Sequence, residues 1–136
     1  MAVAAPAVRQ ALTRRDGAVM LADATLLHVL KRDGRYLSWP HWLDAAGITS
    51  VDAGKGFEFD NLDLAIEAAI AGLDSTIADW HMVADDLAAG RLVQLFETLV
   101  PGTQSYWWVH PPQTAPTGPL ETFERWLRAT LETRHA

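Results

Sequence analysis

The sequence predicts a single α/β domain in which short strands alternate with helices. The stretch of residues 57–96 combines a strand-like alternation, two apolar helical patterns that end at glycines, and a further apolar run. The chain has 136 residues, of which 49% are hydrophobic and 21% charged. This size and composition suit one buried core and are too small for two. Alternation of strands and helices is typical of layered α/β folds.

The first third of the chain contains two expected helices and one expected strand. Residues 6–15 begin with a proline, which suits the first turn of a helix, and end before the turn-forming residues 16–17. The apolar run of residues 25–30 is expected to be a buried strand. Residues 38–47 are expected to form a helix that is capped by Ser38 and closed by Gly47.

The central stretch predicts three strands and two helices. Phe57 and Phe59 alternate with acidic residues, as in a half-buried strand. Asn61 or Asp60 then caps a helix that ends at Gly72. Residues 75–78 are expected to be a brief strand, residues 79–89 a helix, and residues 92–96 a strand. The first of these helices carries one apolar stripe, formed by Leu62, Ala65, Ile66, Ala69 and Ile70.

The last third is rich in aromatic residues. Residues 105–110 have strong β-propensity and are expected to form a strand that stops at two prolines. Residues 120–131 are expected to be an amphipathic helix with Phe123, Trp126, Leu127 and Leu131 facing inward. We assign Trp39, Trp42 and Trp126 to packing. Trp80, Trp107 and Trp108 stay open between packing and an aromatic ligand pocket.

Composition narrows the class of function. The net charge of -6 argues against binding nucleic acid through an overall basic field, so we expect no direct nucleic-acid binding by this chain. The absence of cysteine excludes disulfides and thiolate metal sites, and no histidine pair has metal-binding spacing. No apolar run is long enough to span a membrane, and no signal peptide is recognisable. We expect a cytoplasmic protein without membrane association, metal or cofactor.

Five motifs stand in order along the chain. They are W-x-x-W-L-x-x-A-G at residues 39–47, F-x-x-D-N with A-I-E-A-A-I-A-G within residues 57–72, V-A-D-D-L-A-A-G-R-L-V at residues 83–93, Y-W-W-V at residues 106–109 and F-x-x-W-L at residues 123–127. In order and approximate spacing they resemble the effector-binding region of LysR-type transcriptional regulators, and most of all the branch that contains the glycine-cleavage and β-lactamase activators.

The resemblance covers about residues 20–131 and implies a lobe of the type II periplasmic-binding-protein fold, with a mixed sheet flanked by helices. It implies one domain, residues 1–136, without a DNA-binding part. Residues 1–20 would be a helical extension, residues 21–98 a complete α/β lobe, and residues 99–136 the returning strand and C-terminal helix of the other lobe. Because that strand would otherwise leave a bare edge, we expect a homodimer.

The resemblance also implies two ligand-binding residues. Tyr106 matches an aromatic position that lines the effector cleft in the family, and Asn61 lies at a helix start where the family has a hydroxyl or amide facing the ligand. A helix N-terminus offers unpaired amides and positive partial charge, which suit an anion. The alternative, that Asn61 is only a helix cap and Tyr106 only a sheet residue, stays open.

Further candidate ligand-binding residues come from the sequence itself. Asp79, Trp80 and His81 lie where the chain departs from the family pattern, at residues 73–81. A carboxylate and a histidine can act as acid and base, and a tryptophan can stack on a ring, although consecutive residues diverge on a helix and a surface turn is the simpler interpretation. Trp108 is a candidate aromatic wall, and His28 is a core or cleft-edge histidine within an apolar strand.

The leading hypothesis is a small-molecule effector-binding domain without catalytic residues. One alternative is a stand-alone protein that sequesters a ligand. A second alternative is an enzyme that uses the cleft, with Asp79 and His81 as acid and base. No serine, cysteine or lysine is placed by a motif beside a base, so the sequence gives no support for nucleophilic catalysis.

Overall fold

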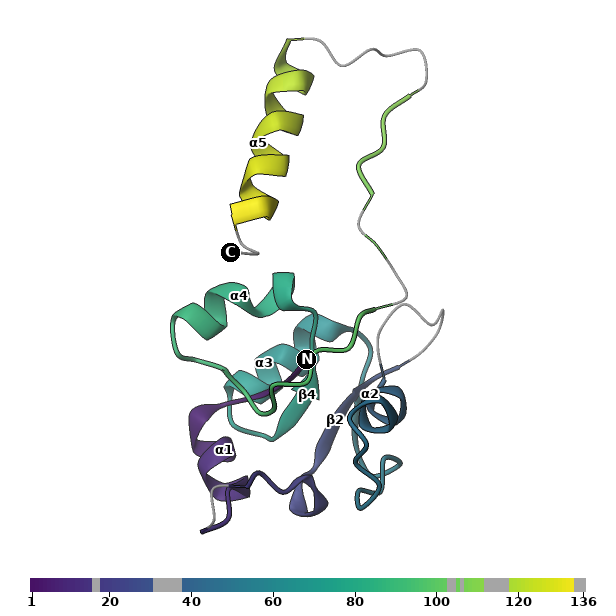
Figure 1. Cartoon of the computed structure of the whole chain (residues 1–136), viewed down its shortest axis with the longest axis vertical. Coiled ribbons are helices and arrows are strands. Elements are labelled where there is room, and N and C mark those ends of the chain that lie inside the picture. The colour runs from purple at the N-terminus through teal and green to yellow at the C-terminus, as the bar shows by residue number, and fades with distance from the viewer. Residues whose placement is uncertain (16–17, 31–37, 103–104, 106, 112–117, 134–136) are drawn as a thin grey trace. The chain divides into compact units, whose positions relative to one another are not determined.

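The computed structural model describes residues 1–15, 18–30, 38–102, 105, 107–111 and 118–133. The chain forms two compact units, Met1–Gln104 and Ser105–Ala136. Unit 1 holds the sheet and the helices packed on it, and unit 2 holds one long helix (Figure 1). Within the described ranges, no helix combines the length and hydrophobicity needed to cross a bilayer.

Unit 1 is built on a five-stranded mixed sheet, which confirms the predicted α/β class. The strand order is β3-β2-β4-β1-β5, in which β2 is parallel to β3 and β4, while β1 is antiparallel to β4 and β5. In chain order the elements are β1 (Ala2–Ala4), α1 (Pro6–Leu12), the 3-10 helix η1 (Leu21–Asp23), β2 (Leu26–Val29), α2 (Trp39–Ala45), β3 (Gly56–Phe59), α3 (Leu62–Ile70), β4 (Ser75–Ile77), α4 (Trp80–Ala88) and β5 (Val93–Gln94).

Buried side chains cover both faces of the sheet. Successive side chains of a strand point to opposite faces, and β2 shows the result. Leu26 packs in a cluster with Trp39 and Trp42 of α2, whereas Leu27 packs in a second cluster with Leu62 of α3. Trp39 and Trp42 are fully buried, with ring centroids 5.8 Å apart in an edge-to-face arrangement. Their assignment to packing is confirmed.

The strand β1 is not predicted by the sequence, and neither is the short 3-10 helix η1. The expected helix over residues 6–15 is present as α1, but Ala2–Ala4 before it lie between β4 and β5 and are completely buried. Alanine has low β-propensity, and the first residues of a domain are commonly poorly ordered, so local signals do not indicate a strand here. Pairing with two neighbouring strands overrides both signals.

The predicted helices are present, but α1 ends at Leu12, three residues before its predicted end, and one predicted capping contact is missing. Asn61 caps α3, because its Oδ1 accepts a hydrogen bond from the backbone N–H of Leu64 at 2.9 Å. Gly72, with φ of +82°, ends the same helix as predicted. Ser38 holds the N-cap position of α2 but makes no side-chain cap hydrogen bond, so the predicted capping role is wrong although the helix is correct.

The edge strand β3 departs from the predicted burial. Phe59 packs against a core cluster, but Phe57 is 53% exposed. An edge strand has a neighbour on one side only, and its side chains are covered by fewer elements. Gly56 starts this strand with φ of +141°, and a Cβ there would lie 1.8 Å from the carbonyl oxygen of Leu26. Only glycine allows β3 to approach β2 this closely.

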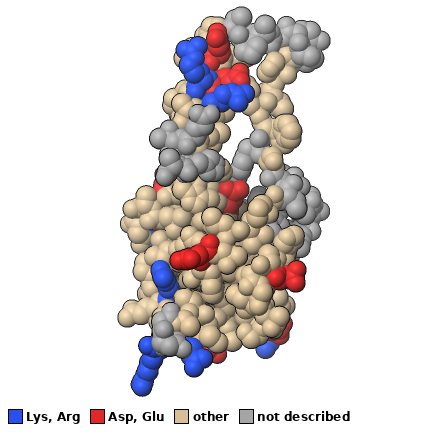
Figure 2. Space-filling model, in the orientation of Figure 1, with Lys and Arg blue, Asp and Glu red and all other residues tan. Residues whose placement is uncertain are grey.

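Unit 2 contains α5 (Pro119–Thr133), which confirms the predicted C-terminal helix. Its charged side chains pair at i, i+4 spacing. Arg125 lies 3.4 Å from Glu121, and Arg128 lies 2.8 Å from Glu124. Basic and acidic atoms therefore lie next to each other on this helix (Figure 2).

The aromatic residues of unit 2 differ from the prediction in two ways. Phe123 and Trp126 of α5 are 44% and 57% exposed instead of facing inward. Residues 105 and 107–110 form no strand, although the sequence predicts one over residues 105–110. Aromatic β-propensity reflects packing on a pleated, paired surface, and the described residues of unit 2 include no strand with which this segment pairs.

Candidate ligand-binding site

The candidate site lies around the carboxyl ends of the three parallel strands. The strands β2, β3 and β4 lead into α2, α3 and α4 respectively. Because parallel strands end at the same edge of a sheet, the N-termini of these helices lie along that edge, and the side chains of Asn61 and Asp79 cap two of them. Open α/β sheets bind ligands outside this edge.

Asn61 lies at this edge directly after β3 and is exposed. Its side-chain oxygen caps α3 through the 2.9 Å hydrogen bond from Leu64. The capping role is thus established by geometry, and the expected contact with a ligand stays a prediction.

The Asp79 cluster holds the corresponding position after β4. The carboxylate of Asp79 accepts a hydrogen bond from the backbone N–H of His81 at 2.9 Å and caps α4. The rings of Trp80 and His81 lie edge to face with centroids 5.8 Å apart. Burial lowers the pKa of the Met1 amino group, which donates to the carbonyl of Ala78, and the charge of Asp79 opposes that shift. Ligand binding or acid-base chemistry by this cluster stays a prediction.

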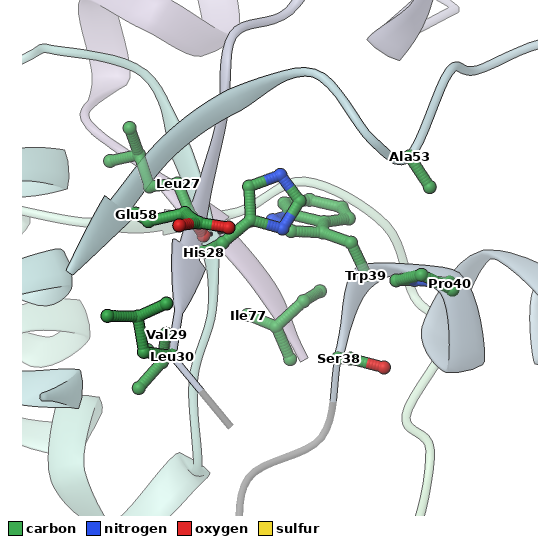
Figure 3. Close-up of a pocket in the computed structure, with 10 residues that line it drawn as sticks. All are labelled: Leu27, His28, Val29, Leu30, Ser38, Trp39, Pro40, Ala53, Glu58 and Ile77. Carbon is green, nitrogen blue, oxygen red and sulfur yellow. Dashed lines mark hydrogen bonds between the residues drawn. The ribbon is translucent and has the colours of Figure 1, made fainter. Parts of the chain in front are cut away.

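A pocket of about 270 Å³ lies beside β2, against the start of α2. Its walls come from β2, from the first turn of α2, from the loop before β3, and from single residues of β3 and β4 (Figure 3). It is lined by Leu27, His28, Val29, Leu30, Ser38, Trp39, Pro40, Ala53, Glu58 and Ile77.

His28 and Glu58 form the polar wall of this pocket. They are register partners on β2 and β3, so their side chains project from the same face of the sheet. Figure 3 shows the imidazole and the carboxylate reaching into the same space. The Nε2 atom of His28 lies 3.0 Å from the carbonyl oxygen of Lys55. A carbonyl only accepts hydrogen bonds, so Nε2 carries a proton there, and in the neutral ring Nδ1 is an acceptor.

The start of α2 forms the opposite wall. The buried indole of Trp39 donates its N–H to the carbonyl oxygen of Leu27 at 3.1 Å, which fixes α2 against β2. Since Ser38 makes no cap hydrogen bond, its hydroxyl is not used by the helix. Pro40 adds an apolar surface beside it.

A second hollow of about 330 Å³ adjoins the pocket at the start of β3. It shares three residues with the first pocket, which are His28, Ala53 and Glu58. Gly54, Gly56 and Phe57 complete its lining. His28 therefore lines two concave regions, and its predicted role in ligand binding stays a prediction.

The lining residues Glu58, Ser38 and Ala53 are not predicted by the sequence to bind a ligand. The alternation around Glu58 indicates that it points away from the face of its phenylalanine neighbours. The register that brings Glu58 beside His28 depends on the pairing of two separate strands, and a shift of one residue would reverse the face. No local signal in the sequence gives that register.

Two of the predicted ligand-binding residues, Tyr106 and Trp108, belong to the aromatic segment of residues 105–110. Trp108 belongs to unit 2 and packs on Phe123, with ring centroids 5.3 Å apart. Tyr106 lies outside the described residues. His28, Asn61 and the Asp79 cluster all belong to unit 1, and of these residues His28 lines the pocket.

Comparisons with known proteins agree with the fold. The model of the LysR substrate binding domain matches residues 1–132. The transcriptional regulator TrpI of Pseudomonas aeruginosa is 31% identical over 132 residues, which cover 93% of this chain and 43% of TrpI. The glycine cleavage system transcriptional activator of Escherichia coli is 27% identical over 109 residues, which cover 80% of this chain and 34% of the activator.

A solved structure extends the similarity to three dimensions. The effector domain of the transcriptional regulator AmpR of Pseudomonas aeruginosa aligns with a TM-score of 0.69 at 28% identity, over 99% of this chain and 63% of that domain. This alignment confirms the predicted resemblance to type II periplasmic-binding-protein lobes. The chain spans less than half the length of the two regulators above.

Proposed function

The chain belongs to the LysR substrate binding domain family, and on this premise we propose that it binds a small-molecule effector where β2 ends and α2 begins. The pocket of about 270 Å³ is the observation that carries the proposal. Its mainly apolar walls and few polar groups are typical of small-ligand sites. Because liquid water occupies about 30 Å³ per molecule, the pocket has room for roughly nine waters, which corresponds to a ligand of about ten non-hydrogen atoms.

Neighbouring polar residues extend the proposed site along the same edge. Asn61 and Asp79 begin the next two helices after their strands, and both are exposed. In this proposal His28 contacts the ligand from the pocket wall, while Asn61 and the Asp79 cluster contact any part of the ligand that extends beyond the pocket.

Effector binding would serve transcription regulation in the cytoplasm, since the relatives are named as transcriptional regulators and activators. A homodimer is part of the same proposal. The exposed aromatic side chains of unit 2, including Trp107 and Trp126, support a partner surface because large exposed apolar groups often mark interaction sites. Sequestration of the ligand without a regulatory output is the alternative. A transcription assay with the ligand present and absent distinguishes the two roles.

Native mass spectrometry of the purified chain tests the binding proposal. We expect a fraction of the protein to carry a co-purified small molecule, and the same spectrum reports the oligomeric state. Ala53→Phe places a benzyl group at the pocket and should remove the bound molecule. Ala88→Phe is the matched control, because Ala88 is exposed on α4, and it should retain the molecule.

Two results together would contradict the proposal. One is a wild-type chain that carries no small molecule. The other is a melting temperature that amino acids, amines and carboxylic acids leave unchanged in both the wild type and Ala53→Phe. A monomer at micromolar concentration would contradict the homodimer alone.

A further inference from the structure

We propose that the pocket beside β2 selects ligands that carry an ammonium group on a small apolar body. The inference rests on the proposed function, because it names the ligand class of the same pocket. It follows from the hydrogen-bonding character of the polar wall, which consists of acceptors.

Glu58 supplies the negative charge of that wall. In the part of the chain that the structure describes, Glu58 takes part in no salt bridge. The lysine nearest to it in sequence, Lys55, lies 3.7 Å from the carboxylate of Asp52. The charge of Glu58 is thus available to a ligand at the pocket.

His28 adds a second acceptor. Its Nε2–H donates to the backbone carbonyl of Lys55 at 3.0 Å, which selects the tautomer with a lone pair on Nδ1. Among the other polar groups of the pocket, the indole N–H of Trp39 is already used by the carbonyl of Leu27. Only the hydroxyl of Ser38 is both donor and acceptor. The polar lining therefore suits a ligand with several N–H donors.

The size and apolar lining define the rest of the ligand. Leucine, valine, proline and isoleucine side chains make up much of the wall, together with the buried ring of Trp39. A hydrocarbon or aromatic body of about ten atoms fits this space. A metal cation is a poorer fit, because no group of three histidine or carboxylate side chains close enough to hold a metal occurs among the described residues.

An anionic or neutral ligand of the same shape would bind less well. An anion would meet the carboxylate of Glu58 and the lone pair of His28, and both would repel it. A neutral ligand would partly desolvate the carboxylate of Glu58 without supplying a countercharge. An ammonium ion has three N–H donors and the opposite charge, so it satisfies both acceptors.

Three probes of matched shape test the inference: phenethylamine, 2-phenylethanol and phenylacetate. Their affinities are measured by calorimetric titration into the wild type, Glu58→Gln and Glu67→Gln. Wild type is expected to bind phenethylamine roughly tenfold more tightly than 2-phenylethanol, as for a charge-assisted hydrogen bond in a partly exposed site. Glu58→Gln should abolish this preference. Glu67→Gln, an exposed change on α3, should retain it.

The outcomes separate the ligand class from the site. If 2-phenylethanol or phenylacetate binds as tightly as phenethylamine, and Ala53→Phe abolishes that binding, the ammonium preference is wrong and the pocket stands. If Glu58→Gln keeps the preference for the amine, Glu58 is not its receptor and the inference is overturned. If none of the probes binds, or Ala53→Phe leaves all affinities unchanged, both the inference and the proposed site fail.

Discussion

Replacing Asn61 by alanine is expected to lower the free energy of unfolding by about 1 kcal/mol. The side-chain oxygen of Asn61 accepts the backbone N–H of Leu64 at 2.9 Å, and alanine leaves that amide to water. Ser38→Ala is the matched control. Ser38 holds the same position at the start of α2 but makes no side-chain cap hydrogen bond. Ser38→Ala should therefore lower the free energy of unfolding by less than about 0.5 kcal/mol.

The expected magnitude follows from the exposure of the cap. Loss of an N-cap side chain costs between about 0.5 and 2 kcal/mol. Asn61 is exposed, so water replaces part of the lost hydrogen bond, and we place the value near the middle of this range. For a domain of this size, 1 kcal/mol corresponds to a change of about 3–5 °C in melting temperature.

Asn61→Asp separates the structural role from the proposed ligand contact. Aspartate caps helices as well as asparagine, and its charge complements the helix N-terminus, so stability should be kept or slightly raised. A loss of effector affinity in this variant would therefore come from replacing the amide by a carboxylate and not from fraying of α3.

Urea titration followed by tryptophan fluorescence and circular dichroism measures these differences. A Ser38→Ala variant that is destabilised as much as Asn61→Ala would refute the capping role of Asn61. A loss of stability in Asn61→Asp equal to that in Asn61→Ala would refute it as well.

Three further predictions concern backbone approach, a buried carboxylate and unit 2. Gly56→Ala should lower the free energy of unfolding by about 2 kcal/mol or more in the same urea titration, because the added Cβ would lie 1.8 Å from the carbonyl oxygen of Leu26 at a strained φ. Gly54→Ala is the control. Its added Cβ has a nearest contact of 3.4 Å, so its stability should stay close to that of the wild type. Asp74→Ala should cost about 2–3 kcal/mol, since its buried carboxylate accepts two backbone amides at 2.6 and 2.7 Å; wild-type stability would contradict this. Trp126→Glu places a charge on the proposed partner surface of unit 2, so it should reduce the molecular mass measured by light scattering and leave the urea midpoint of unit 1 unchanged. A dimer mass that stays unchanged would rule out a role of this residue in the interface.

The sequence is informative where the structure depends on neighbours along the chain. The helix α3 is an example, because its cap at Asn61, its apolar stripe and its stop at Gly72 are all local signals, and all three are present in the structure. The burial of Trp39 and Trp42 follows from their spacing on one side of α2 in the same way.

Elements that depend on distant partners are not predictable in this way. The strand Ala2–Ala4 is set by pairing with β4 and β5, more than seventy residues away in the sequence, and its alanines carry no β signal. The converse holds for residues 105–110. There the local β signal is strong, yet the described residues of the segment form no strand.

The chemistry of the candidate pocket is likewise a product of strand pairing. The close approach allowed by Gly56 places β3 against β2, and the same pairing brings Glu58 beside His28. It also places the carbonyl of Lys55 at the imidazole, which selects the tautomer with an accepting Nδ1. The polarity of the pocket is therefore determined by backbone geometry as much as by side-chain identity. A histidine and a glutamate thirty residues apart in the sequence lie side by side because their strands pair, and the glycine at the start of the edge strand allows the close approach of that strand.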